Sequence, residues 1–451
     1  MNDPRTRALL ALDRQHVWHP YTPADDPRDP LGPLVIDRAE GAFFWDSAGK
    51  RYIDANSSWW VATLGHRHPR LIKTLQTQSE TLTHIALGGI THEPAAKLAQ
   101  ELTAIMPGHD DPNVPADRKL SRVFYSDDGS TAVEVAIKLC AQYWAQNGRA
   151  DRTKFLSFRG AFHGETVGAT SVGGIDVFRK VYGPLLFEVV QLPPPWELAQ
   201  ASVESIVERI AREADTLAAV IIEPMVQGAD GMRTYGPEFL RALREACTKS
   251  DVFLIADEVF TGLGRTGPMW ACEHAGVVPD VLCSAKGLSG AMFPFAVTVA
   301  NERMYDGFRG DSTRAFLYGH SYCGNPLGCA IAREVLAIYR DEDVLAHAQS
   351  LAPTLAEGFA RIAQRIPQAQ RPRALGMLGA VDLSTSSSAD YHSDLGWRVF
   401  AQARKRGVYL RPLGATVYIA PPLTIAHDTL HELLAVVEES VAAALSQSGS
   451  F

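Results

Sequence analysis

Two residues that follow predicted strands have side chains suited to covalent catalysis. Asp257 ends the apolar run 254–256, and Lys286 follows the strand-like run 281–285. Ligands of open α/β sheets bind beyond the carboxyl ends of the strands, so both side chains are predicted at one edge of a sheet. A partly unprotonated amine attacks carbonyl groups, and a carboxylate keeps an aromatic ring nitrogen protonated so that the ring withdraws electrons. Lys286 and Asp257 are predicted to fill these two roles.

Each of these two residues also has an ordinary structural explanation. A lysine at the end of a strand is usually solvated, and an aspartate there often caps a helix or forms a surface salt bridge. The presence of Asp257 together with Lys286 favours the catalytic interpretation.

A glycine and a serine that precede a predicted helix form a candidate anion site. Gly129 and Ser130 lead into the amphipathic stretch 131–144. Free backbone amides and the dipole at a helix N-terminus favour a phosphate group. An ordinary helix cap has the same sequence pattern, so this signal is weak by itself.

An aromatic residue and a histidine follow the strand-like segment 154–158. Phe162 is placed to stack on a planar ring, and His163 is its neighbour. A buried core aromatic is the more common outcome for such a residue. This signal is therefore also weak alone.

The segment 262–267 matches the GxGxxG pattern of nicotinamide-binding proteins. A long helix follows that motif in dinucleotide-binding folds, whereas Pro268 follows it here. We therefore predict that the glycines shape a loop of the active site that presents Arg265.

The elements that must position these residues alternate along the chain. Apolar runs such as residues 220–222 and 252–255 alternate with amphipathic stretches such as residues 237–249. The alternation predicts an α/β fold with a largely parallel sheet.

The same pattern divides the chain into two predicted domains. Residues 76–330 are predicted to form a large domain, and residues 1–75 and 331–451 a small α+β domain built from both termini. A hairpin-like stretch at 41–54 is expected to pair with the C-terminal part. Serine-rich residues 384–388 and the terminus 447–451 are expected to be a loop and a frayed end.

Composition excludes several classes of protein. The 451 residues carry a net charge of -8, which argues against a nucleic-acid surface, and no apolar run approaches the length of a membrane helix. The six cysteines form no CxxC pair, so we expect no metal site and no disulfide scaffold. With no signal-peptide pattern at the start, we expect a cytoplasmic protein that acts on small molecules.

Together, these segments resemble the class III, fold-type I aminotransferases over nearly the whole chain. Within that family they resemble the branch that aminates 8-amino-7-oxononanoate, and the doublet Trp59-Trp60 is the feature that separates this branch from others. The most specific segments are residues 16–22, 54–60, 222–228, 257–267 and 411–414.

The resemblance implies a fold-type I transferase that uses pyridoxal 5'-phosphate. It implies that Lys286 forms the Schiff base and moves the proton, that Asp257 pairs with the pyridine nitrogen, and that Phe162 stacks on the ring. It also implies a phosphate site at Gly129 and Ser130. The remaining cofactor-binding residues that it implies are His163, Glu223, His320 and Ser321.

For the substrate, the resemblance implies a pocket walled by Tyr21, Trp59 and Trp60, with Tyr21 also counted among the catalytic residues. Arg411 would bind the carboxylate of 8-amino-7-oxononanoate, since a guanidinium group binds carboxylates in a bidentate manner. Without the resemblance, the tryptophans would be interpreted as core aromatics and Arg411 as half of a surface ion pair. Phe162, Arg265 and Gly319 complete the implied substrate-binding set.

The implied activity is a ping-pong transamination that yields 7,8-diaminononanoate for biotin synthesis. Members that take S-adenosylmethionine usually have tyrosine in place of Phe162 and Gly-Pro-Thr in place of residues 319–321. The sequence here also resembles members that use lysine, so the donor is either S-adenosylmethionine or lysine. A homodimer with shared active sites is implied, in which Ser321 reaches the phosphate across the interface.

Three other functions compete with this interpretation. The nearest is a broad ω-amino acid or diamine aminotransferase on the same fold, against which the Trp59-Trp60 doublet argues. A non-catalytic cofactor-binding or scaffolding protein is disfavoured by Lys286 and Asp257. An NAD-linked oxidoreductase would rest on the segment 262–267 alone.

Overall fold

The chain divides into two compact units. The computed structural model describes residues 3–23, 32–383, 391 and 393–446. Unit 1 consists of Met1–His68 together with Ser350–Phe451, and unit 2 is Pro69–Gln349. The expected loop at 384–388 and the expected frayed end at 447–451 lie outside the described residues.

The unit boundaries differ from the domain boundaries predicted at residues 75 and 331. Both α3 (Pro69–Ser79) and α4 (Glu93–Ala104) pack against α11 (Pro326–Asp341), so all three helices belong to unit 2. The second boundary lies inside α12 (Val344–Arg365). Contacts between helices so far apart in sequence leave no mark on local periodicity, which is why the sequence placed the boundaries elsewhere.

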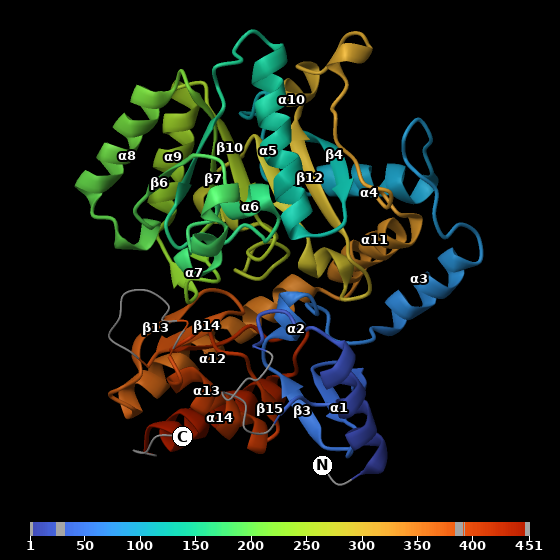
Figure 1. Ribbon diagram of the computed structural model, residues 1–451, viewed down its shortest axis with the longest axis vertical. Coiled ribbons are helices and arrows are strands. Elements are labelled where there is room, and N and C mark those ends of the chain that lie inside the picture. The colour runs from blue at the N-terminus through green and yellow to red at the C-terminus, as the bar shows by residue number, and fades with distance from the viewer. Residues whose placement is uncertain (1–2, 24–31, 384–390, 392, 447–451) are drawn as a thin grey trace. The chain divides into compact units, whose positions relative to one another are not determined.

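A seven-stranded sheet forms the centre of unit 2 (Figure 1). The strand order is β4-β12-β11-β10-β7-β5-β6, in which β12 runs antiparallel to both of its neighbours and the other pairs are parallel. The prediction of a largely parallel α/β sheet is confirmed. Its strands are β4 (Leu120–Ser126), β5 (Lys154–Phe158), β6 (Val189–Leu192), β7 (Leu217–Ile222), β10 (Phe253–Asp257), β11 (Val281–Ser284) and β12 (Ala296–Asn301).

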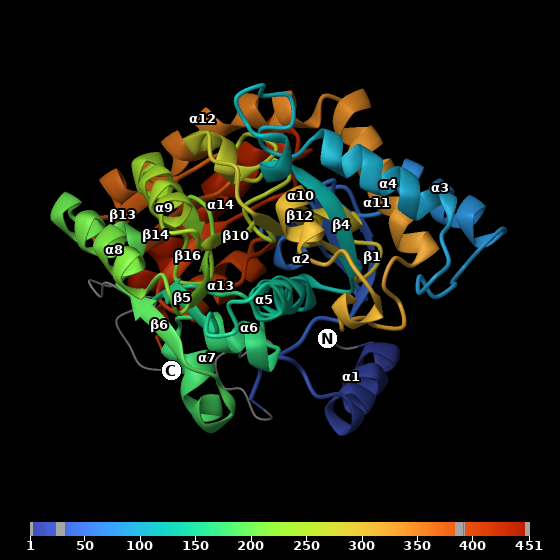
Figure 2. The same cartoon turned by 90° about the horizontal axis from the view of Figure 1, so that it is seen from above.

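The two faces of this sheet are covered by different helices. On β10, Phe253 and Ile255 lie in the core that includes α5, whereas Leu254 and Ala256 lie in the core that includes α9. Figures 1 and 2 show α5 and α9 on opposite sides of β10. Strands that are buried on both faces read as continuous apolar runs, which explains why these strands were visible in the sequence.

The other helices of unit 2 agree with the predicted alternation of elements. The predicted helix at 237–249 is α9, and the predicted helix at 131–144 forms most of α5. The described part of the chain contains no helix with the length and apolar character needed to cross a bilayer. The remaining elements of unit 2 are α5 (Gly129–Gln146), α6 (Val167–Val172), α7 (Asp176–Arg179), α8 (Gln200–Glu213), α9 (Pro237–Lys249), α10 (Glu302–Asp306) and the ribbon of β8 (Val226–Gln227) and β9 (Arg233–Thr234).

Unit 1 joins segments from both ends of the chain. Strands β2 and β3 form an antiparallel hairpin, and β3 pairs in parallel with β15 near the C-terminus. The predicted hairpin and its pairing with the C-terminal part are confirmed. Unit 1 contains α1 (Pro4–His16), β1 (Ile36–Glu40), β2 (Phe43–Asp46), β3 (Arg51–Asp54), α2 (Ser57–Trp60), β13 (Gln370–Ala374), β14 (Gly379–Asp382), α13 (Leu395–Lys405), β15 (Val408–Tyr409), β16 (Thr416–Ile419) and α14 (His427–Ser446).

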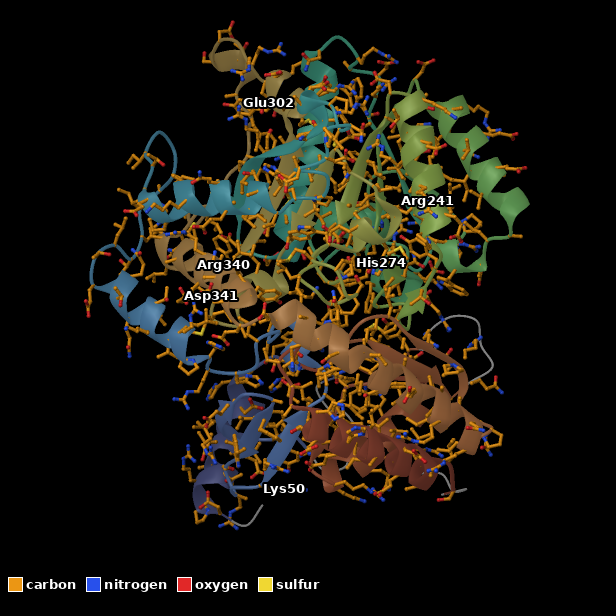
Figure 3. The ribbon with its side chains drawn as sticks, turned by 180° about the vertical axis from the view of Figure 1, so that it is seen from behind. Lys50, Arg241, His274, Glu302, Arg340 and Asp341 are labelled. Carbon is orange, nitrogen blue, oxygen red and sulfur yellow. The ribbon has the colours of Figure 1, made fainter. Side chains whose placement is uncertain are left out.

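A lysine in the hairpin turn makes further contacts between the N-terminal and C-terminal segments. Lys50, labelled in Figure 3, donates from Nζ to the carbonyl oxygens of Arg404 at 3.0 Å and Lys405 at 2.9 Å. Both carbonyls lie at the C-terminal end of α13, where unpaired carbonyl groups and the helix dipole favour a cation. The turn between β2 and β3 is thereby fixed to a helix from the other end of the chain.

Candidate active site

A buried carboxylate and imidazole lie at the carboxyl end of β10. Asp257 Oδ2 is 2.7 Å from His163 Nδ1, and since a carboxylate only accepts, Nδ1 is the donor. Asp257 Oδ1 accepts from the backbone N–H of Val259 at 3.1 Å. Both side chains are at least 95% buried. The pair holds the Asp257 carboxylate in one orientation inside unit 2.

Lys286 follows the neighbouring strand β11 and begins a short 3-10 turn, η5 (Lys286–Ser289). Its φ of 42° lies in the left-handed region, a strained conformation for a lysine that is often found at functional sites. Burial lowers the pKa of the Lys286 amine, while the carboxylates of Asp257, Glu223 and Asp128 oppose that shift. A lowered pKa increases the fraction of amine that is unprotonated and nucleophilic.

A second carboxyl group follows β7, the strand on the other side of β10. Glu223 accepts hydrogen bonds from the backbone N–H groups of Phe162 at 3.0 Å and Gly228 at 3.1 Å. Burial, reinforced by the charge of Asp257, raises the pKa of Glu223 to about 8. Lys286, Asp257 and Glu223 thus follow three adjacent parallel strands, as expected for ligand-binding groups of an α/β sheet.

The N-terminus of α5 provides donors for an anion. Asp128 caps the helix by accepting from Thr131 N–H at 2.9 Å. The backbone N–H groups of Gly129 and Ser130 have no acceptor among the described residues, as is usual in the first turn of a helix. A Cβ at Gly129 would lie 2.7 Å from Val259 Cγ1, so the close approach of the helix to that loop requires glycine.

The loop that carries Phe162 and His163 is tied to this helix. Ser130 Oγ accepts from Glu165 N–H at 3.1 Å, and Glu134 Oε1 accepts from Gly168 N–H at 2.7 Å. Phe162 is half-buried, and its ring contacts Phe178 edge to face with centroids 5.6 Å apart. The predicted anion site and the predicted stacking residue therefore lie on segments that contact each other.

These residues fit pyridoxal phosphate, the group implied by the sequence resemblance. Lys286 offers an amine to its aldehyde, Asp257 offers a carboxylate to its ring nitrogen, and the first turn of α5 offers amide donors to its phosphate. A further indication is His163 Nε2, which is buried and has no hydrogen-bond partner among the described residues.

Among the predicted residues 319–321, His320 contacts the segment that precedes α5. His320 Nδ1 lies 2.9 Å from Asp127 Oδ2, and His320 Nε2 lies 2.8 Å from the hydroxyl of Tyr318. Gly319 and Ser321 on either side are exposed. His320 is therefore placed beside the candidate phosphate site, while the roles of Gly319 and Ser321 remain predictions.

The loop with the GxGxxG pattern is held by a carboxylate that the sequence did not single out. Glu258 accepts from Thr261 Oγ1 at 2.8 Å and from the backbone N–H groups of Ala271 and Cys272 at 2.9 and 2.8 Å. His274, labelled in Figure 3, lies with Nε2 3.0 Å from the carbonyl oxygen of Thr266. No long helix follows the glycines, since the next helical element within the described residues is the short 3-10 turn η4 (Ala271–Ala275).

Arg265, which this loop was predicted to present, is only 1% exposed. The guanidinium group therefore lies inside unit 2, and its role in substrate binding remains a prediction. Glu258 had a signal in the sequence, because it directly follows Asp257 at the end of a buried strand. An acidic residue buried there needs hydrogen-bond donors, and the loop supplies them.

The predicted substrate-pocket residues of unit 1 form an aromatic cluster with an arginine. Tyr21 and Trp59 meet edge to face with centroids 5.6 Å apart, and both are partly exposed. The guanidinium carbon of Arg411 lies 5.4 Å from the ring centroid of Trp59 and 5.3 Å from that of Trp397. Trp60 points elsewhere and donates from Nε1 to the hydroxyl of Tyr418 at 3.2 Å. The structure therefore brings Tyr21, Trp59 and Arg411 together within unit 1.

The tryptophan doublet sits on an unusual backbone. The four consecutive residues of α2, Ser57–Trp60, have φ values of 48°, 47°, 59° and 73°, so the element is one turn of left-handed helix. Left-handed conformations cost about 1–2 kcal/mol for each residue other than glycine. Neither the periodicity nor the residue types of 57–60 predicted this turn, because serine and tryptophan have no preference for it.

Comparisons with known proteins agree with this geometry. Residues 25–441 match the family model described as aminotransferase class-III. Two curated relatives are named adenosylmethionine-8-amino-7-oxononanoate aminotransferase. The protein from Synechococcus elongatus is 42% identical, with 94% of this chain and 98% of the relative covered, and that from Nitratidesulfovibrio vulgaris is 39% identical, with 97% and 82% covered.

Solved structures give the same fold. The adenosylmethionine-8-amino-7-oxononanoate aminotransferase of Methanocaldococcus jannaschii has a TM-score of 0.91 at 32% identity, with 97% of this chain and 99% of that chain covered. An amine transaminase from an uncultivated Pseudomonas species, described in its PLP-bound form, has a TM-score of 0.87 at 32% identity, with 96% and 99% covered. The expected fold-type I transferase is confirmed.

Proposed function

The chain belongs to the class III aminotransferases, which use pyridoxal phosphate, and we propose that it aminates 8-amino-7-oxononanoate to 7,8-diaminononanoate in biotin synthesis. The main observation in favour of this chemistry is that Lys286, Asp257 and Glu223 lie at the carboxyl ends of three adjacent parallel strands. The names of the relatives that match nearly the full chain support the choice of substrate.

The proposal gives each residue of unit 2 a defined task. When bound, pyridoxal phosphate supplies an aldehyde that stores the donor's amino group and a ring that stabilises negative charge at the reacting carbon. Lys286 Nζ would hold the cofactor at its aldehyde and, when free, would take the proton from the donor carbon. Asp257, oriented by His163, keeps the ring nitrogen protonated. Gly129 and Ser130 hold the phosphate.

The electrostatics of the site favour these tasks. Burial lowers the pKa of Lys286, so a larger fraction of the released amine is unprotonated and able to accept the proton. The pKa of Glu223 near 8 keeps that group largely protonated at neutral pH. Asp257 is then the negative charge that remains beside the ring nitrogen.

The cluster in unit 1 is proposed to recognise the amine acceptor. 8-Amino-7-oxononanoate combines an apolar chain with a terminal carboxylate. Arg411 suits the carboxylate because a guanidinium group makes two parallel hydrogen bonds to it, and Trp59 and Tyr21 offer apolar surface to the chain. Trp60, Phe162, Arg265 and Gly319 are also proposed to bind substrate.

The proposed amino donor is S-adenosylmethionine, with lysine as the alternative. The names of the relatives favour S-adenosylmethionine, whereas Phe162 and His320 depart from the residues usual in enzymes that use it. The purified protein should lose its visible cofactor band when the correct donor is added without an acceptor. Bleaching by lysine alone would replace the proposed donor, and bleaching by neither would reject both.

A second candidate function is a broad amine or diamine aminotransferase. The observation in its favour is the likeness to the amine transaminase from the Pseudomonas species, whose identity of 32% equals that of the Methanocaldococcus jannaschii enzyme. The two functions are separated by the second half-reaction. The pyridoxamine form of the protein should be reoxidised by 8-amino-7-oxononanoate much faster than by simple aldehydes and ketones, and the reverse order would establish the alternative.

We also propose a cytoplasmic homodimer with shared active sites, in which Ser321 reaches the phosphate of the other subunit. Large apolar side chains next to the segment 319–321 are exposed, namely Leu317 at 74% and Tyr322 at 61%. Such exposure suits an interface with a second copy. The unpaired cysteines suit a reducing compartment. Light scattering on the purified protein tests the dimer.

A further inference from the structure

The left-handed turn Ser57–Trp60 requires something that holds it. Consecutive left-handed residues other than glycine persist only where the surrounding structure over-determines them. Two sets of hydrogen bonds within unit 1 do this. One set comes from the strand that precedes the turn, and the other from segments near the C-terminus.

The first set converges on one buried carboxylate at the end of β3. Asp54, which is 1% exposed, accepts from Asn56 N–H on Oδ1 at 3.2 Å and from Ser58 Oγ on Oδ2 at 3.0 Å. His66 Nε2 lies 2.9 Å from the same Oδ2 and is the third donor. One carboxylate thus holds the residue before the turn, a residue inside it and a residue after it.

The second set links the turn to the segment that carries Arg411. Asn56 Oδ1 accepts from the backbone N–H of Arg411 at 2.6 Å. Asn56 Nδ2 donates to the carbonyl oxygen of Tyr418 at 3.4 Å, and Ser57 Oγ donates to that of Ala420 at 2.8 Å. Asn56 therefore fixes the backbone of Arg411 and the start of the turn at once.

We propose that Asp54, with His66 and Asn56, positions Trp59 against Arg411 and thereby sets the affinity for the amine acceptor. These are positioning residues, since they act through Trp59 and Arg411. The proposal rests on the function proposed above, because it takes Trp59 and Arg411 as the acceptor-binding groups. The backbone N–H of Arg411 and the hydroxyl of Ser58 meet in one network, so a disturbance at Asp54 is expected to change the 5.4 Å contact between the indole and the guanidinium.

The sharpest test uses Ser58, because its side chain is exposed and its replacement does not endanger folding. Ser58→Ala removes the hydroxyl and keeps the strained φ of 47°, whereas Ser58→Gly removes the hydroxyl and the strain together. We expect Ser58→Ala to raise the KM for 8-amino-7-oxononanoate by about tenfold and Ser58→Gly by clearly less, since small misplacements of binding groups cost up to about a hundredfold. Equal KM values in both variants and the native chain would overturn the proposal.

The second test replaces the carboxylate itself. Asp54→Ala should raise the acceptor KM by more than Ser58→Ala does, Asp54→Asn should recover part of the loss, and the rate of the donor half-reaction should stay unchanged. Asp382→Ala is the matched control, because Asp382 is 2% exposed in the same unit and binds Arg371 and Arg373 instead of the turn. If Asp54→Ala lowers the Tm as the control does and leaves the KM unchanged, the network is structural only and the proposal is wrong.

A separate measurement keeps this inference distinct from the proposed function. If the native chain does not aminate 8-amino-7-oxononanoate, the function fails on that assay alone. The near-ultraviolet circular dichroism band that Trp59→Phe removes then reports on the turn. Its loss in Asp54→Ala, but not in Asp382→Ala, supports the positioning role, and its persistence in Asp54→Ala rejects it.

Discussion

The two units position their functional side chains in different ways. In unit 2, Lys286, Asp257 and Glu223 follow regular parallel strands and are surrounded by protein, so their chemistry is set by burial and by neighbouring charges. In unit 1, Trp59 and Tyr21 are exposed and stand on left-handed backbone, and we propose that a hydrogen-bonded network around Asp54 sets the placement of Trp59.

This difference matches what each region must do. A group that transfers protons needs a shifted pKa, and burial at the edge of the sheet supplies one. A group that recognises the end of a flexible substrate needs an exact direction more than a shifted pKa. The strained turn gives Trp59 a direction that a regular helix or strand at residues 57–60 would not give.

The largest loss of activity is expected for Lys286→Ala in unit 2. Turnover should fall by about ten-thousandfold or more, because both the covalent attachment and the proton transfer are lost. The variant should still bind pyridoxal phosphate, since the phosphate and ring contacts remain. Lys249→Ala, at the end of α9, is the control and should keep its rate. Turnover within tenfold of native in Lys286→Ala would contradict the account.

Asp257→Asn should have the next largest effect. An amide cannot hold the ring nitrogen protonated, so turnover should fall by roughly a hundredfold to a thousandfold, with the loss in both half-reactions. The same replacement at Asp382 in unit 1 should leave the donor half-reaction at its native rate. Stopped-flow absorbance measures the rate of each half-reaction in both variants. Equal losses of rate at Asp257 and Asp382 would show that catalysis does not depend specifically on the carboxylate of unit 2.

Arg411→Lys should affect only recognition. Lysine keeps the charge and loses the bidentate geometry, so the acceptor KM should rise by about ten- to a hundredfold while the donor half-reaction is unchanged. Steady-state kinetics with varied acceptor measure the change. A slower donor half-reaction with a native acceptor KM would show that Arg411 acts on the donor instead.

The smallest effect is a dependence of stability on pH that belongs to unit 2. Glu223 has a pKa of about 8 in the folded state against 4.5 for an ordinary glutamate carboxyl, so folding stabilises its protonated form. That contribution is fully present below pH 4.5 and is lost as the pH rises to 8. The Tm of the cofactor-free protein should therefore fall between pH 5 and pH 8, and Glu223→Gln should reduce the slope.

Part of this slope should survive in Glu223→Gln. Glu258 is also buried, and burial raises its pKa to about 7, so it contributes with the same sign. The double variant Glu223→Gln with Glu258→Gln should show the flattest profile. A native slope in Glu223→Gln would mean that Glu223 is ionised in the cofactor-free protein.

The candidate catalytic residues of unit 2 could be identified from the sequence because their signals are local. A buried parallel strand reads as an apolar run, and the residue after it is marked by its type, as with Asp257 and Lys286. The hydrogen-bond partners of Asp257 and Glu223 were not predictable, because His163 and Phe162 lie on the loop after β5, far from both carboxyl groups in the sequence.

The residues of unit 1 were found only by resemblance to a family. Tyr21, Trp59 and Arg411 are separated by up to several hundred positions and share no periodicity. The left-handed turn has no signal in its own residues, since the bonds that hold it come from Asp54, Asn56 and His66. The predicted domain boundaries differ from the unit boundaries for a similar reason, because the packing of α3 and α4 on α11 is a long-range contact.

Borohydride reduction measures whether Lys286 binds pyridoxal phosphate covalently. Reduction of the purified protein fixes the cofactor on the amine that holds it, and peptide mapping by mass spectrometry then identifies that residue. We expect a phosphopyridoxyl group on Lys286 and none in a sample first converted by the amino donor. A label on another lysine, or an active protein without a label at Lys286, would show that Lys286 is not the attachment residue.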